Sequence, residues 1–154
     1  MKKLLCMMLI VIVASLSSIV LAGTPINSAE VPKAAIEFLD QYFPGDKLIK
    51  AEKEQGRRGM TYEVDLQGGA EIDFRENGDW KEVKVADGYT IPAGIVPEAI
   101  SKYVTDNFKG LDIVEISCKR GGYELELSNE TELKLTKDAK PMPAQSKRRH
   151  GNRR

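Results

Sequence analysis

Apolar and polar residues alternate in several short stretches of the chain. In the first of them Tyr62, Val64 and Leu66 share one parity, and Glu63 and Asp65 share the other. The same alternation occurs in four further ranges: 71–75, 82–85, 123–127 and 132–135. A period of two predicts β-strands, and one apolar plus one polar face is typical of an antiparallel sheet that is covered on one side.

Two other stretches have the three- and four-residue spacing of an amphipathic helix. Their apolar positions are Ala35, Phe38, Leu39, Tyr42 and Phe43 in the first, and Ile100, Tyr103, Val104 and Phe108 in the second. Pro32 and Pro97 precede them and suit a first helical turn, because that position needs no backbone N–H. We therefore predict two helices that cover the apolar face of the sheet.

The order of helix and strands occurs twice along the chain. The block that begins at Val31-Pro32 returns 65 positions later at Val96-Pro97, and residues 62–66 return 61 positions later as 123–127. We predict a tandem duplication, with repeat 1 at residues 31–90 and repeat 2 at residues 91–140. The predicted fold class is α+β in two layers, and each repeat supplies a helix and three or four antiparallel strands.

Turn residues mark the ends of the predicted strands. Asn77-Gly78 lies between two alternating stretches, and both residues tolerate positive φ, so we predict a hairpin there. The segment Asp73–Asp79 superficially resembles a calcium loop, but its spacing departs from that of an EF-hand, which favours a hairpin without metal. Pro141 and Pro143 predict that the fourth strand of repeat 2 is short, displaced or absent.

The two ends of the chain differ from the repeats in composition. Residues 1–22 combine a basic start, an apolar run and the ending Val20-Leu21-Ala22, which together predict a cleavable signal peptide. A permanent membrane anchor is the competing interpretation. Residues 23–30 are then a linker, and residues 141–154 are a basic disordered tail. We expect a periplasmic or secreted protein that has no membrane span after signal cleavage.

Charge and rare residues exclude some classes of function. The chain has 154 residues with 23 basic and 23 acidic side chains, and all the acidic ones lie between residues 23 and 138. One His and two Cys are too few for a structural zinc site, which takes about four such ligands. Removal of Cys6 with the signal peptide would leave Cys118, whose alternation with polar neighbours places it on the apolar side of a strand. Pairing between chains and a role as a reactive nucleophile are the alternatives.

The polar face of the predicted sheet is the candidate site. It carries eight acidic residues, namely Glu63, Asp65, Glu71, Asp73, Glu82, Glu124, Glu126 and Glu132. Alternation counted back from Val83 adds Trp80 to this face as a binding anchor. The alternatives are a slip of register after the Asn77-Gly78 turn and a Trp80 ring that caps the edge of the core. Two catalytic carboxylates need different environments that separate their pKa values, and a cleft that holds the substrate. An open sheet face offers neither. We therefore favour charges that solvate the strand face, or a partner-binding face, over catalysis.

Several segments together resemble one protein family. They are Ile91-Pro92, Val96–Ile100, Gly122–Leu127 and the positions Asp73, Gly78, Asp79 and Trp80. This ordered set spans residues 30–140 and resembles the PepSY-like, β-lactamase-inhibitor-like exported proteins of Bacteroidetes. The resemblance implies that two copies of a helix and four strands share one curved sheet with the helices on one face. It carries over no catalytic residue, and the basic tail and shortened last strand depart from the family pattern.

We predict a non-enzymatic exported binding module that binds or inhibits another envelope or secreted protein through its free sheet face. The alternative is a periplasmic small-ligand or cation sensor that uses the acidic face. A hydrolase ranks third, because no nucleophile, base and His constellation remains after signal removal. We expect no catalytic residue, no metal or other cofactor and no nucleic-acid partner, and the sequence leaves the oligomeric state open.

Overall fold

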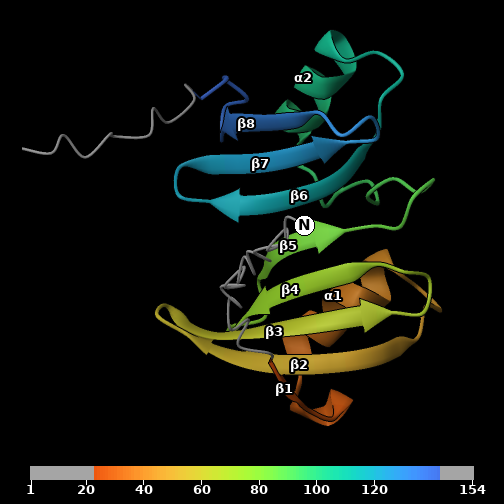
Figure 1. Cartoon of the computed structure of the whole chain (residues 1–154), viewed down its shortest axis with the longest axis vertical. Coiled ribbons are helices and arrows are strands. Elements are labelled where there is room, and N and C mark those ends of the chain that lie inside the picture. The colour runs from red at the N-terminus through yellow and green to blue at the C-terminus, as the bar shows by residue number, and fades with distance from the viewer. Residues whose placement is uncertain (1–22, 143–154) are drawn as a thin grey trace, which may run out of the picture.

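Every strand of the sheet pairs with its neighbours in the sequence. A computed structural model describes residues 23–142 and gives an open antiparallel sheet of eight strands in the order β1 to β8 (Figure 1). The elements are β1 (Thr24–Pro25), a 3-10 turn (Ser28–Glu30), α1 (Lys33–Tyr42), β2 (Leu48–Gly56), β3 (Gly59–Leu66), β4 (Glu71–Arg75), β5 (Trp80–Lys84), α2 (Glu98–Asn107), β6 (Ile113–Lys119), β7 (Gly122–Leu127) and β8 (Glu132–Thr136). The predicted α+β class is therefore confirmed.

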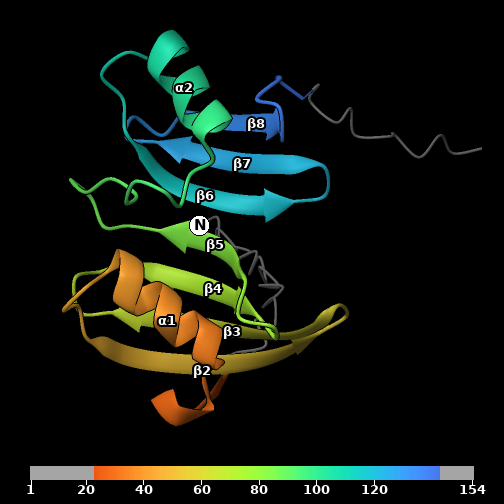
Figure 2. The same cartoon turned by 180° about the vertical axis from the view of Figure 1, so that it is seen from behind.

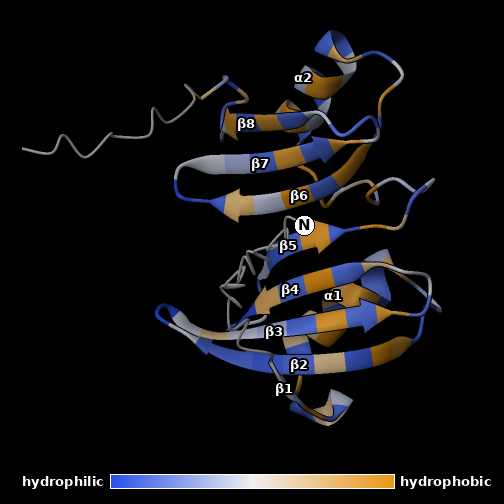
Figure 3. Cartoon of the chain, in the orientation of Figure 1, coloured by the Kyte–Doolittle hydropathy of each residue, from blue (hydrophilic) through white to orange (hydrophobic). Residues whose placement is uncertain are grey.

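Both helices lie against the same face of the sheet. Figure 2 shows α1 across the part built from β2 to β4, and α2 across the part built from β6 to β8. Polarity alternates along the strands (Figure 3), and the apolar side chains face the helices. The largest fully buried side chains are Phe74, Leu66, Ile72, Ile100, Ile116, Leu127, Leu135, Val64 and Val83. Each contributes about 1.5–3 kcal/mol by its removal from water.

The two helices begin and end with the same geometry. Pro32 and Pro97 precede them with φ of −53° and −56°, as the proline positions predicted. Phe43 and Phe108 end them with φ of −129° and −130°, and each N–H donates to the carbonyl four residues earlier. Both rings are half-buried and pack against the core. Equivalent local sequences therefore give equivalent helix ends in the two halves of the chain.

The end of the second half departs from the first. Thr136 N–H donates to Lys140 O at 2.8 Å, just as Arg75 N–H donates to Asp79 O at 2.8 Å, so the turns after β8 and β4 correspond. The first half continues into β5, whereas the second forms an isolated bridge at Pro141, just before the described residues end at 142. Proline has no N–H for a ladder, so Pro141 cannot donate to the sheet there. The rest of the predicted short or absent fourth strand lies outside the described residues.

The predicted linker at residues 23–30 takes part in the sheet. Thr24 pairs with Lys53, and Pro25 pairs with Glu52, which makes β1 a two-residue edge strand beside β2. Ile26 N–H also donates to the carbonyl of Ala51 at 2.9 Å. Such a short strand shows no periodicity, so the alternation of polar and apolar residues does not reveal it.

The β4–β5 turn packs against the start of α1. Gly78 is buried with φ +84°, and a Cβ at this position would lie 2.6 Å from the Cβ of Ala34. Asp79 N–H donates to Asn77 Oδ1 at 3.1 Å, which fixes the turn from within. The predicted Asn77-Gly78 hairpin is therefore confirmed, and its glycine is needed both for its φ and for the close approach of the helix.

Substitution of Gly78 tests this contact. Gly78→Ala should destabilise the fold by about 2–4 kcal/mol, because it adds backbone strain and a clash with Ala34. Gly45 has a similar φ of +81° but open space around its Cβ position, so Gly45→Ala should cost only about 1 kcal/mol. Urea unfolding of both variants gives the difference. Equal losses would show that the helix contact adds nothing.

Candidate binding face of the sheet

Two rows of polar side chains cross the sheet on the face away from the helices. The strand register aligns the first row as Glu52, Glu63, Asp73, Glu82, Ser117, Glu124 and Lys134. It aligns the second row as Lys50, Asp65, Glu71, Lys84, Glu115, Glu126 and Glu132. We call these the first and second carboxylate rows, since most of their members are Asp or Glu.

The structure brings together eight of the nine predicted site residues. All eight acidic candidates lie in the two carboxylate rows, on five strands from β3 to β8. Sequence reasoning left Glu52 and Glu115 out of the set, although both complete the rows. A register shift near the start of β2 and of β6 interrupts the alternation there, but Glu115 still alternates with the buried Ile116.

Lys50 forms ion pairs with three carboxylates at one end of the rows. Its Nζ lies 3.3 Å from Glu52, 3.2 Å from Glu63 and 3.5 Å from Asp65, measured to carboxylate oxygens. The hydrogen bond to Glu63 is the main reason that the pKa of Lys50 is raised above its ordinary value. One positive charge therefore faces three negative charges, so this end of the face keeps a net negative charge.

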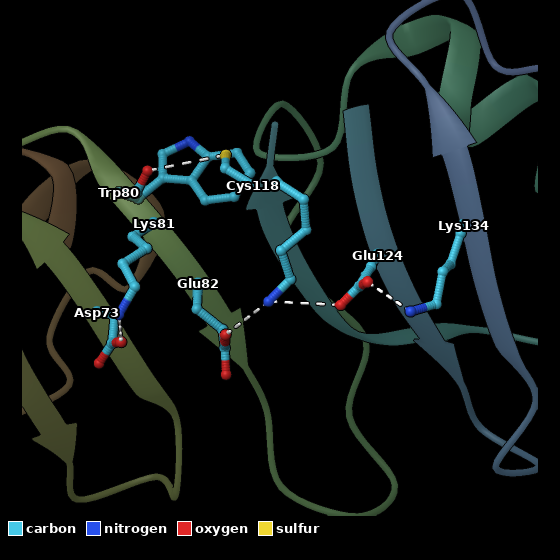
Figure 4. A network of polar contacts seen from close by, with 8 residues as sticks. Asp73, Trp80, Lys81, Glu82, Cys118, Glu124 and Lys134 are labelled. Carbon is cyan, nitrogen blue, oxygen red and sulfur yellow. Dashed lines mark hydrogen bonds and ion pairs between the residues drawn. The ribbon is translucent and has the colours of Figure 1, made fainter. Parts of the chain in front are cut away.

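A second set of ion pairs lies across the middle of the first row (Figure 4). Lys81 Nζ lies 2.7 Å from Asp73, and Lys119 Nζ lies 4.0 Å from Glu82 and 3.4 Å from Glu124. Lys134 donates to Glu124 at 2.6 Å, and this hydrogen bond is the main reason that the pKa of Glu124 is lowered. Lysines thus compensate the first row almost along its whole length.

The second row has less compensation over β6 to β8. Glu115 pairs directly with Glu126, and Glu126 pairs with Glu132. Within residues 23–142, no Lys or Arg lies within 4.0 Å of these three carboxylates. Burial raises the pKa of Glu115, and the nearby charge of Glu82 raises it further. Like charges that stand directly opposite each other destabilise a sheet, so this corner is electrostatically unfavourable.

The prediction that Trp80 lies on the polar face is wrong. Asp73 pairs with Glu82, but the next residue, Phe74, pairs with Trp80, because a β-bulge leaves Lys81 as an extra residue in β5. The bulge reverses the parity of β5 at this point. Trp80 consequently shares the helix side with Phe74, while Lys81 contacts Asp73 on the polar side.

Trp80 is half-buried at the edge of the core. Its ring stacks on Tyr123 with centroids 6.4 Å apart, and it packs against the buried cluster. The backbone carbonyl of Trp80 accepts a hydrogen bond from Arg75 Nη1 at 2.8 Å and lies 3.9 Å from Cys118 Sγ. Cys118 is half-buried beside it, and burial raises the pKa of its thiol. The thiol is therefore less nucleophilic than an exposed cysteine at neutral pH.

The described residues contain no arrangement typical of a metal site or of a membrane helix. Between residues 23 and 142, no three Asp, Glu, His or Cys side chains are grouped so that they could hold a metal ion. In the segment Asp73–Asp79, Asn77 Nδ2 donates to Asp79 at 2.7 Å within the hairpin turn. In the same part of the chain, neither helix is long and apolar enough to cross a membrane. The predicted signal peptide and basic tail lie outside the described residues.

The geometry agrees with the comparison of the chain with known proteins. A family described as "Putative beta-lactamase-inhibitor-like, PepSY-like" matches residues 60–140. The chain belongs to this PepSY-like family. The resemblance stated from the sequence is therefore confirmed. No curated protein matches the chain.

Three solved structures are similar to this chain in fold. One is a "putative calcium-regulated periplasmic protein" of Bacteroides thetaiotaomicron, with 32% identity, a TM-score of 0.71 and coverage of 78% of this chain and 94% of that chain. Two are described as a "putative periplasmic protein" of Bacteroides vulgatus. They have 29% and 28% identity, TM-scores of 0.72 and 0.74, and cover 78% and 79% of this chain and 94% and 98% of theirs.

The position of Trp80 gives a stability prediction. Trp80→Ala should destabilise the fold by about 1–3 kcal/mol, which is below the range for a fully buried aromatic because the ring is half-exposed. Trp80→Phe should recover part of the loss, since it keeps a ring against Tyr123. Chemical denaturation measures both changes. A loss below about 0.5 kcal/mol for the alanine variant would place the ring outside the core.

The raised pKa of Glu115 gives a pH-dependent prediction. Because the folded protein binds this proton more tightly than the unfolded chain, ionised Glu115 destabilises the fold as the pH rises from below 4.5 through the raised pKa. Glu115→Gln should therefore raise the melting temperature at pH 7, and the gain should vanish in strongly acidic solution. Glu124→Gln is the control with the opposite sign at pH 7, because the pKa of Glu124 is lowered. A pH-independent gain for Glu115→Gln would refute the assignment.

Proposed function

We propose that the protein is an exported periplasmic binding module that binds another protein through its two carboxylate rows. The three similar structures are described as periplasmic proteins, and the predicted signal peptide agrees with export. The family description favours protein binding over catalysis. The partner would present a complementary cationic surface to the exposed sheet face, and inhibition of an envelope hydrolase is one form that such binding could take.

One observation carries the proposal: the rows place acidic residues opposite each other on adjacent strands. Glu115 opposite Glu126 and Glu126 opposite Glu132 are unfavourable pairs for the folded state. A soluble surface needs only a mixture of charges. Rows in which Lys and Glu alternate would provide that mixture without repulsion between neighbouring side chains. A surface that keeps destabilising residues is more readily explained by binding than by stability.

We also propose that the chain arose by tandem duplication. The matched helix ends and the matched turns after β4 and β8 support it. Two copies joined in one sheet would present a wider face than one copy, and the carboxylate rows run across the boundary between β5 and β6. A broad, charged face of this kind suits a protein partner better than a small molecule.

A cation sensor is the second candidate, and one observation favours it. One similar structure is described as calcium-regulated. The three opposed carboxylates Glu115, Glu126 and Glu132 would be relieved by a bound cation, although they do not form a grouping suited to a metal in this structure. Calcium titration by calorimetry distinguishes the candidates, since a protein-binding face needs no calcium.

A charge-removal variant tests the binding face. The triple variant Glu71→Gln, Glu126→Gln and Glu132→Gln should keep or slightly raise stability, because it removes opposed like charges. It should reduce capture of the partner from the envelope extract of the parent bacterium by at least about tenfold. Capture is quantified by mass spectrometry against the unmodified protein at equal salt.

A matched variant controls for net charge. Asp40→Asn, Asp87→Asn and Asp138→Asn remove the same number of charges from exposed positions outside the two rows. This control should capture the partner as well as the unmodified protein does. If both variants lose partner capture equally, net charge alone explains the effect. If neither variant loses partner capture, the carboxylate rows are excluded as the binding site.

A further inference from the structure

A cationic hollow lies at one end of the sheet, where the β2–β3 hairpin projects beyond the neighbouring strands (Figure 1). Its volume is about 560 Å³, which lies in the range of small-ligand sites. Four positive side chains line it, namely Arg57, Arg58, Arg75 and Lys81, against one acidic residue, Glu76. The hollow therefore has the opposite charge to the carboxylate rows on the same molecule.

Two of these cations have no internal partner. Within residues 23–142, no carboxylate lies within 4.0 Å of Arg57 or Arg58 at the tip of the hairpin. Lys81 is different, because Asp73 pairs with it at 2.7 Å. In a region with more acidic than basic residues, two adjacent guanidinium groups without a carboxylate partner are available to an outside anion.

A third cation, Arg75, is held in place by a backbone carbonyl. Arg75 Nη1 donates to the carbonyl of Trp80 at 2.8 Å, which fixes one side of the guanidinium at the wall of the hollow. A neutral carbonyl leaves the full charge of Arg75 unbalanced. The remaining N–H groups of the fixed side chain can donate to a ligand with less loss of side-chain entropy than those of a free arginine.

The first half of the chain supplies ten of the eleven residues that line the hollow, and Cys118 of β6 supplies the eleventh. Lys53 pairs with Tyr62, and the equivalent pair in the second half is Cys118 with Tyr123. Eight residues connect the first pair and four connect the second. The four additional residues make the longer β2–β3 hairpin, which contains Arg57 and Arg58 and forms one wall of the hollow.

We infer that this hollow binds carboxylate groups, with Arg57 and Arg58 on one side of the ligand and Arg75 on the other. Guanidinium groups match carboxylates in shape and donate two parallel hydrogen bonds to them. Met60 and Cys118 also line the hollow and provide apolar contact for a short aliphatic stem between two carboxylates. A free dicarboxylate and a pair of acidic side chains on a peptide share this chemistry.

The site is independent of the proposed function of the carboxylate rows. An acidic ligand is repelled by the rows and attracted by the hollow, so it should bind only at this end of the sheet. A cationic partner has the reverse preference. The two proposals can therefore fail separately.

The test is a titration of the full mature protein, labelled with ¹⁵N, with glutarate, acetyl-Glu-Glu amide and the uncharged analogue glutaramide. Glutarate and the peptide should give saturable amide shifts at Gly56–Thr61 and Glu76–Asn77, whereas glutaramide should give none. Tighter binding of the peptide identifies an acidic peptide as the natural ligand class, and tighter binding of glutarate identifies a free dicarboxylate. Shifts without saturation, or equal shifts with glutaramide, would overturn the assignment.

Variants locate the binding. Arg57→Gln with Arg58→Gln should weaken binding about tenfold or more, since two exposed charge pairs are lost. The control, Lys109→Gln with Arg120→Gln, removes the same charge from exposed positions, and Arg120 lies at the tip of the shorter β6–β7 hairpin. The control should bind as the unmodified protein does. Equal weakening in both would mean that net charge, and not the hollow, attracts the ligand. Circular dichroism verifies that both variants fold.

Discussion

The burial of one sheet face under two short helices is the constraint on which the rest of the structure depends. Helices of ten residues, such as α1 and α2, are not stable alone, so their contact with residues such as Phe74 and Ile116 forms the helices and covers the sheet together. This contact also fixes the strand register, because a slip of one residue would expose the whole apolar set. The alignment of the carboxylate rows is a consequence of this register on the opposite face.

The β-bulge in β5 changes this register locally. It places both Lys81 and Glu82 on the polar face, so that Lys81 compensates Asp73, and it turns Trp80 towards the core. It also leaves the carbonyl of Trp80 free to accept from Arg75. A single additional residue thereby connects the edge of the core, the first carboxylate row and the wall of the cationic hollow.

The sequence predicts the features that follow from burial along the whole sheet, and it misses those that depend on strand pairing at single positions. Burial acts on every strand with a period of two, so the pattern predicted both helices, the covered face and the acidic positions from Glu63 to Glu132. The bulge depends on how Phe74 and Trp80 pair across strands, which alternation along one strand does not encode. The two-residue strand β1 depends in the same way on its neighbour β2, and it has no pattern of its own.

The two halves of the chain agree where they form the core and differ outside it. Equivalent helix ends and turns are retained because they hold the common core, as Phe43 and Phe108 illustrate. The longer β2–β3 hairpin and the single bridge at Pro141 lie at opposite ends of the strand order, outside that core. Changes there leave the buried face intact. An acidic face that spans both halves and a cationic hollow beside the longer hairpin of the first half can therefore coexist on one scaffold, and each can be altered without loss of the other.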